Sequence, residues 1–229
     1  AYPSGLAMNK RQKINIGWID GQWGPTNQLT IPIADRGLNF SDGIFETILI
    51  HNGKAILLDK HLTRWKHNAS ILKMASPPSK KFLLPLIDEA IKRTCLSNGN
   101  GALRLNWSRG NKLDRGITIS KELLQQNNHR FWLELHKADP YFDSVTTIIS
   151  SYEKRNVNSK YSRCKTFAYG QAIQAKYEAN IAGYDEALLL STNGELCCST
   201  TANILIKRKE QWLTPRLESG CLPGIMRQQ

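Results

Sequence analysis

Apolar residues recur at two spacings along this chain, and each spacing predicts a kind of secondary structure. Between residues 168 and 183, alanines three or four positions apart predict a helix whose small-residue face packs on a sheet; they are Ala168, Ala172, Ala175, Ala179 and Ala182. Gly183 follows, where a helix end favours a residue that can take a positive φ angle. Beyond it, two apolar runs flank Asn193-Gly194, which is a strong hairpin signal.

The first half of the chain shows the same two patterns. Residues 14–22 predict a strand, a turn at Asp20-Gly21 and a second strand, and residues 35–37 carry turn-forming side chains. A helix is predicted to begin at Leu58, with a buried face formed by Leu62, Trp65, Ala69 and Leu72. A second helix is predicted over residues 80–96, and further strands over 44–50, 102–107, 131–135 and 145–150.

The order of these elements predicts an α/β (α+β) fold of two domains. Residues 136–140 have the composition of a linker. We therefore expect an N-terminal α/β domain over residues 1–137 and a C-terminal, mostly β, barrel-like domain over 138–229. A chain of 229 residues can hold two modest cores of this kind.

Composition narrows the class of protein. A hydrophobic fraction of 41% and a charged fraction of 22% describe an ordinary globular chain. We find no apolar run long enough for a membrane span and no signal peptide pattern, so no membrane partner is expected. Five cysteines, an odd number, do not suggest a disulfide framework, and a reducing cytoplasm is the expected location.

The net charge of +12 raises nucleic acid as a possible partner. The basic residues are spread along the chain, however, with a local concentration only over residues 153–165. They are not accompanied by an aromatic RNA-binding motif or a helix-turn-helix pattern. A site for a phosphorylated cofactor and a carboxylate-rich substrate explains the charge equally well, so we expect a small-molecule substrate, no nucleic acid and no metal.

Lys165 lies just ahead of the helix predicted to end at Gly183. In isolation such a lysine is most often a solvated surface residue. The motifs around it are K-T-x-x-Y, A-K-x-E-A, G-x-D-E-A-L-L-L and N-G-E-L followed by T-A-N-I-L. Together they resemble the fold-type IV pyridoxal-phosphate enzymes, which include aminodeoxychorismate lyase, the D-amino-acid aminotransferases and the branched-chain aminotransferases. The resemblance implies that Lys165 forms the Schiff base with pyridoxal 5'-phosphate.

Three further motifs extend the resemblance over most of the chain. The motif D-R-G-x-x-x-x-D-G-x-F-E-T implies that Phe45 is a wall of the substrate pocket. The motif H-x-x-R implies that Arg64 clamps the cofactor phosphate, since a planar guanidinium suits two oxygens; a surface arginine is the alternative. The ending T-P-R-L…G-x-L-P-G-I-M-R, typical of the lyase branch, implies that Leu222 packs on the pyridine ring and that the backbone N–H groups of Ile225 and Met226 hold the phosphate.

The resemblance assigns four more residues. It places Thr201 and Tyr169 at the cofactor, although Tyr169 could equally be a core aromatic. The pairing S-R-G…R-G implies that Arg115 binds the substrate carboxylate, with an exposed loop arginine as the equal alternative. Cys198 stands where the family has a glutamate that pairs with the pyridine nitrogen. A neutral thiol there weakens the ring as an electron sink, and only a bulge would let Glu195 substitute.

These assignments lead to one function with two alternatives. We expect a lyase that converts 4-amino-4-deoxychorismate to 4-aminobenzoate, a folate precursor, and pyruvate. Lys165 would hold the cofactor and then shuttle protons, its pKa lowered by Arg163 and partial burial. A D-amino-acid or branched-chain aminotransferase is the first alternative, and a non-catalytic cofactor-binding or nucleic-acid-associated protein is the second. The resemblance also implies a homodimer. Members of the family continue well beyond the position of Arg227, so the C-terminal domain is expected to be short relative to theirs.

Overall fold

The computed structural model describes residues 15–229, so Ile14, the first residue of the predicted hairpin, lies outside the described part. Its helices are α1 (Arg36–Phe40), α2 (Leu58–Ile71), α3 (Lys80–Arg93) and α4 (Gly170–Ile181). Its strands are β1 (Ile16–Ile19), β2 (Gln22–Pro25), β3 (Gly43–His51), β4 (Lys54–Ala55), β5 (Asn100–Ser108), β6 (Arg130–Lys137), β7 (Thr147–Arg155), β8 (Glu186–Ser191), β9 (Leu196–Ser199), β10 (Ile206–Arg208) and β11 (Gln211–Leu213). Short 3₁₀ turns are η1 (Glu122–Leu124), η2 (Gln126–Asn128), η3 (Lys160–Arg163), η4 (Leu217–Ser219) and η5 (Met226–Gln228).

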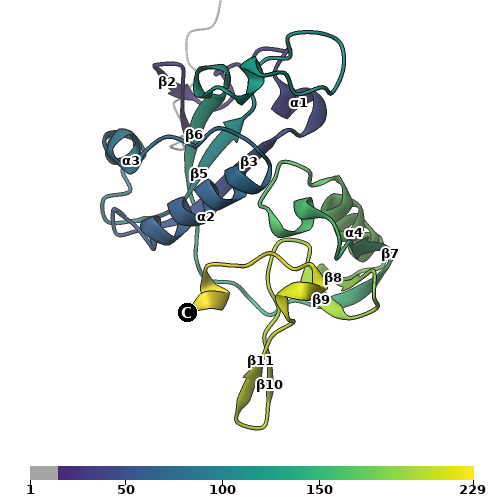
Figure 1. The fold of residues 1–229 in the computed structure, drawn as a ribbon. Helices are drawn as coiled ribbons and strands as arrows, with labels where there is room; N and C mark the ends of the chain where they lie inside the picture. The colour runs from purple at the N-terminus through teal and green to yellow at the C-terminus, as the bar shows by residue number, and fades with distance from the viewer. Residues whose placement is uncertain (1–14) are drawn as a thin grey trace, which may run out of the picture.

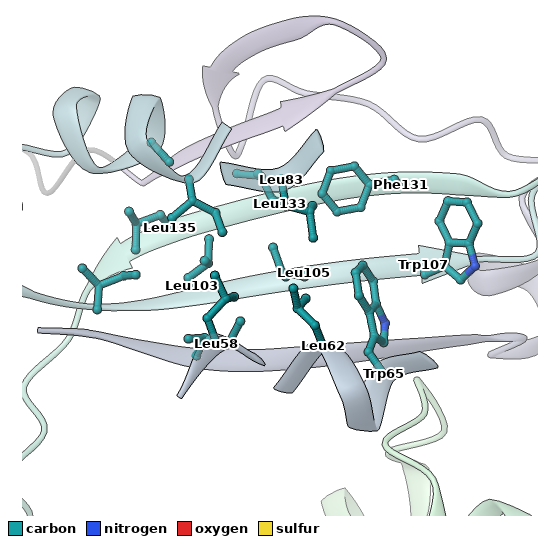
Figure 2. Packing of buried hydrophobic residues seen from close by; sticks show 14 of the residues in the cluster. Leu58, Leu62, Trp65, Leu83, Leu103, Leu105, Trp107, Phe131, Leu133 and Leu135 are labelled. Atoms are coloured by element: carbon teal, nitrogen blue, oxygen red, sulfur yellow. The ribbon is translucent and has the colours of Figure 1, made fainter. Parts of the chain in front are cut away.

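An antiparallel sheet of six strands forms the first half of the molecule. Its strand order is β2-β1-β6-β5-β3-β4, and α2 and α3 cover one face (Figure 1). Alternation along the strands sends apolar side chains to that face, where they meet the two helices. Figure 2 shows this core, which includes Leu58, Leu62, Trp65, Leu83, Leu103, Leu105, Leu133 and Leu135. The opposite face of β5 carries Arg104 and Asn106, and this polar face is where the second half of the chain approaches.

A smaller sheet and one helix form the second half. β7 and β8 are parallel, as the crossover through α4 requires, and β9 pairs antiparallel with β8. The helix α4 packs on β7 and β8 through Ala175 and Ala179, which are fully buried. Ala168 and Ala182 of the predicted alanine face are exposed, because the helix runs only from Gly170 to Ile181. The hairpin of β10 and β11 projects from the rest of the molecule (Figure 1).

Most turn and cap predictions are confirmed. Asp20, Gly21, Gly183 and Gly194 all have positive φ angles, as the two hairpin tips and the helix end demand. Residues 36–40 are a short helix rather than the predicted turn, because the Asp35 carboxylate accepts a hydrogen bond from the Gly37 N–H at 2.8 Å and caps it. The first sheet ends at Lys137 and β7 begins at Thr147; the division into domains at 137 stays a prediction. None of the helices from residue 15 onward is long and apolar enough to cross a membrane.

Candidate functional site

Lys165 is positioned by backbone pairing between two distant parts of the chain. The Phe45 N–H donates to the Lys165 carbonyl at 3.0 Å, and the Phe167 N–H donates to the Gly43 carbonyl at 3.0 Å. A side chain at Gly43 would bring its Cβ within 2.2 Å of the Phe167 ring, so this pairing requires glycine. The segment that carries Lys165 is therefore fixed to the start of β3, where the two halves of the molecule meet.

The side chain of Lys165 lines a cavity of about 490 Å³. Five of the residues predicted from the sequence meet there, namely Lys165, Tyr169, Cys198, Thr201 and Leu222. The rest of the lining is largely polar and includes Arg155, Asn156, Ser159, Ser162, Gln171, Ser199, Thr200 and Asn203. The structure thus brings together side chains that the sequence separates by more than fifty residues.

The Lys165 amine is buried among aromatic and cationic groups. Its Nζ lies 3.5 Å from the Tyr169 hydroxyl and 4.5 Å from the centre of the Phe45 ring. Burial lowers the pKa of Lys165 to about 8; Glu46 opposes this shift, and Arg64 and Arg104 add to it. The predicted lowering is present, but Arg163 is not among its causes, which is a correction to the sequence interpretation. A substantial part of this amine is therefore neutral near pH 8, as a nucleophile or base requires.

Behind Lys165, on the helix side of β3, Glu46 engages two side chains of α2. Its carboxylate, fully buried, accepts from Arg64 Nε at 2.8 Å and from Arg64 Nη2 at 2.6 Å. His61 Nδ1 lies 2.7 Å from the same carboxylate. The remaining arm of Arg64 donates through Nη1 to the Pro223 carbonyl at 3.2 Å. Arg64 thus stands between Glu46 and the loop that begins at Leu222, and its role as a phosphate clamp stays a prediction.

Phe45 is buried on the cavity side of β3. The guanidinium of Arg104 lies 3.6 Å above the Phe45 ring centre, and the Tyr169 ring centre is 5.5 Å away. Phe45 thus supports Lys165 and Tyr169 from behind and is not itself part of the cavity lining. Sequence reasoning missed Arg104, although the alternation of residues 102–107 would have placed it on the face opposite the apolar side chains.

Arg155 and Cys198 form one side of the cavity. Arg155 Nη2 donates to the Ser162 carbonyl at 2.5 Å, while its Nε is buried and has no partner among the described residues. The Cys197 thiol, and then the Arg155 charge, lower the pKa of Cys198. Both thiols are buried because β9 contains a bulge: Leu189 pairs with Cys198 and Leu190 with Leu196, which leaves Cys197 as the extra residue.

The bulge does not bring Glu195 into the cavity. Its Oε1 accepts from Arg216 at 2.5 Å, and it is not among the lining residues. Arg115 is exposed on the loop between β5 and η1 and lies outside the cavity. Ile225 is buried and Met226 exposed at the single 3₁₀ turn η5, also outside the lining. The roles of these last three residues stay predictions.

The residues of the cavity fit pyridoxal phosphate. A buried amine is available for its aldehyde, hydroxyls of Tyr169 and Thr201 for its oxygens, and the unpartnered Nε of Arg155 for negative charge. The volume suits a cofactor of this size. Within residues 15–229, His, Cys, Asp and Glu do not gather into a group of three that could hold a metal ion.

Comparisons with known proteins agree with this geometry. The family model described as "Amino-transferase class IV" matches residues 43–229. A branched-chain-amino-acid aminotransferase-like protein of Arabidopsis thaliana is 26% identical over 231 residues, which are 98% of this chain and 40% of that protein. The aminodeoxychorismate lyase of Bacillus subtilis is 24% identical over 210 residues, 92% of this chain and 70% of the lyase.

Solved structures share the fold. The branched-chain aminotransferase of Escherichia coli aligns with a TM-score of 0.82 at 18% identity, covering 94% of this chain and 72% of the enzyme. That of Thermoproteus uzoniensis, solved with norvaline, aligns with a TM-score of 0.80 at 23% identity, covering 93% and 72%. At these identities the likeness shows the fold alone, and the expected mixed α/β (α+β) fold of this enzyme type is confirmed.

Proposed function

This chain belongs to the class IV aminotransferases, a family of pyridoxal-phosphate enzymes. We propose that, within this family, it acts as a lyase. The proposed reaction converts 4-amino-4-deoxychorismate to 4-aminobenzoate and pyruvate. The observation that carries the cofactor chemistry of this proposal is the largely buried amine of Lys165, whose lowered pKa and cavity position suit both attachment of an aldehyde and transfer of a proton. Because the chain spans only 40% of one relative it matches, the activity of the whole protein is part of the proposal.

In this proposal the cofactor supplies an aldehyde and a ring that accepts an electron pair from the substrate. Lys165 Nζ would hold that aldehyde, and the same amine would take the proton from the amine-bearing substrate carbon and pass it to the departing enolpyruvyl group, which leaves as pyruvate. Tyr169, 3.5 Å from Nζ, orients the amine. The aromatic rings of Phe45 and Tyr169 exclude water from one side of Nζ, which keeps its pKa low.

The character of the cavity wall favours the lyase substrate over a branched-chain amino acid. Leu222 is the only leucine, isoleucine or valine among the lining residues, and hydroxyl and amide groups make up most of the rest. A branched aliphatic side chain gains affinity from bulky aliphatic walls, and this lining offers Leu222 alone; its other apolar surface comes from alanines, cysteines and tyrosine rings. A substrate with two carboxylates and an amine suits hydroxyl groups and the guanidinium of Arg155 better.

An aminotransferase is the second candidate. It is supported by the relatives, several of which are named branched-chain aminotransferases or aminotransferase-like proteins. Such an enzyme would transfer the amino group of an amino acid to a 2-oxo acid in the same cavity. Lys165 would bind the cofactor and move protons in that reaction as well.

A homodimer is also part of the proposal. Arg36 donates to the carbonyls of Ile117 and Thr118, which fixes the loop over residues 111–119 beside α1. Exposed apolar side chains lie on this loop, on α1 and just before α1, namely Ile33, Leu38, Leu113 and Ile117. A second copy docked on this surface would bury these side chains. Arg115 of one copy would then face the cavity of the other. With all five cysteines free, we propose a reducing compartment such as the cytoplasm.

The test supplies purified protein with pyridoxal phosphate and then 4-amino-4-deoxychorismate. We expect a visible absorption band on cofactor binding, followed by equal amounts of 4-aminobenzoate and pyruvate. Lys165→Ala should lose both, while Lys160→Ala, which removes an exposed lysine outside the cavity, should keep both. A band without 4-aminobenzoate, together with amino transfer from a branched-chain amino acid to 2-oxoglutarate, would replace the lyase by the aminotransferase.

A further inference from the structure

The charged side chains that line the cavity of Lys165 are all cations. Among residues 15–229, its charged lining side chains are Lys165 and Arg155, and neither an aspartate nor a glutamate belongs to the lining. Whatever the orientation of a bound cofactor, its ring nitrogen therefore meets no carboxylate on the cavity wall. This is unusual for a cofactor whose ring nitrogen must be protonated to attract electrons strongly, because a cation next to a base disfavours its protonation.

Three carboxylates on the elements around the cavity are engaged elsewhere. Glu46 is bound by Arg64 and His61 on the far face of β3. Glu186 accepts from Thr200 Oγ1 at 2.7 Å and from Lys176 Nζ at 3.2 Å. Glu195 is paired with Arg216, as described above. Since each of these carboxylates already has a cationic partner, freeing one for the cavity would leave a charge uncompensated.

The side of the cavity around Cys198 is positive rather than negative. Arg155 lies there with a buried Nε that has no partner within the described chain. The Cys197 thiol donates toward Cys198, so any negative charge on Cys198 is already offset by this hydrogen bond and by Arg155. Neither side chain therefore supplies the lasting negative charge that would hold a proton on a neighbouring pyridine nitrogen.

We infer that this cavity holds pyridoxal phosphate with its ring nitrogen unprotonated, and that Arg155 and Cys198 are the residues that set this state. The inference rests on the proposed function for the identity of the cofactor and adds to it how the site tunes that cofactor. An unprotonated ring withdraws fewer electrons from the substrate carbon. The site then favours a reaction whose product is itself stabilised, such as formation of an aromatic ring, over reversible amino transfer.

The test measures the ring nitrogen directly, by ¹⁵N NMR of the protein loaded with cofactor labelled at that nitrogen, because protonation moves this resonance strongly upfield. In the wild type at pH 7 we expect the resonance of an unprotonated nitrogen. Cys198→Glu, which introduces a carboxylate, should shift the resonance to the protonated position. Cys198→Gln has nearly the same shape without the charge and should leave it unprotonated.

The outcomes separate this inference from the proposed function. An absent visible band in the wild type would end both, because the cavity would hold no cofactor. A normal band with a protonated ring nitrogen would overturn the inference alone, and loss of that proton in Cys198→Ser would identify the Cys198 thiolate as its partner. If Cys198→Glu fails to fold, the wild-type resonance still decides the question.

Discussion

At the scale of single residues, the buried amine of Lys165 predicts the pH range in which the site reacts. An amine attacks an aldehyde only when neutral, and burial lowers the pKa of Lys165 to about 8. The rate at which the visible band forms with pyridoxal phosphate should therefore rise with pH through about 8 and then level off. Arg104→Gln should move the midpoint upward, because the charge of Arg104 contributes to the lowering.

Stopped-flow absorbance from pH 6 to 10 provides the measurement. Lys112→Gln, a loop substitution outside the cavity, is the control and should leave the midpoint in place. A rate that still rises steeply at pH 10, as the ordinary lysine pKa of 10.5 predicts, would contradict the burial of this amine.

Substitution of Glu46 should greatly lower the free energy of unfolding. Glu46→Gln removes the charge that compensates the buried guanidinium of Arg64, and breaking a buried pair in this way costs about 3–5 kcal/mol. Glu89→Gln is the matched control, because its partner Arg93 lies one turn along an exposed face and such pairs contribute about 0.3–0.5 kcal/mol. Urea unfolding of both variants checks the difference, and similar midpoints would show that the Glu46 pair is not buried in solution.

Sequence reasoning identified the residues with diagnostic motifs but not their partners. Lys165, Tyr169 and Cys198 could be placed at one cavity because motifs fix their spacing along a single stretch. Glu46 and Arg104 were missed because their importance depends on which face of a strand meets which element. That choice is made by packing between segments far apart in the chain, and a local pattern does not contain it.

At the scale of elements, the end of α4 depends on a left-handed residue. Gly183 has a φ of 81°, and a side chain there would cost about 1–2 kcal/mol of strain. Gly183→Ala should lower the free energy of unfolding by that amount, although no atom would obstruct the new Cβ. Gly170→Ala, also unobstructed but without a positive φ, should leave stability unchanged or raise it by about 0.4–1 kcal/mol. If thermal unfolding shows equal changes in stability for the two variants, backbone strain at Gly183 does not account for the effect.

Hydrophobic patterns predict some of these elements closely and miss others. Helices and hairpins with caps and glycine turns were predicted closely, because their signals lie within a few residues. The bulge in β9 was not, since Leu196, Cys197 and Cys198 are all apolar and a run of apolar residues carries no mark of register. Its effect is to turn two consecutive thiols inward, one of them to the cavity.

At the scale of the whole molecule, the cavity lies where the segment of Lys165 joins the first sheet to the second. The residues on its wall come from η3, from α4 and from the turn after β9, so no single element could have predicted its shape. The position of Arg115 adds a question at the same scale. It is exposed and outside the cavity of its own chain; the family resemblance implies that it binds the substrate carboxylate, with an exposed loop arginine as the equal alternative.

A dimer that shares its sites answers this question and makes the last prediction. If Arg115 of one copy serves the cavity of the other, a hybrid of Lys165→Ala and Arg115→Ala chains contains one cavity with both residues intact. Mixing the two inactive variants by refolding should then restore part of the lyase activity. If Arg115 serves its own chain, neither cavity of the hybrid is complete and mixing restores nothing. Sedimentation of Ile117→Lys checks the surface itself, since a charge among these apolar side chains should shift the protein toward the monomer.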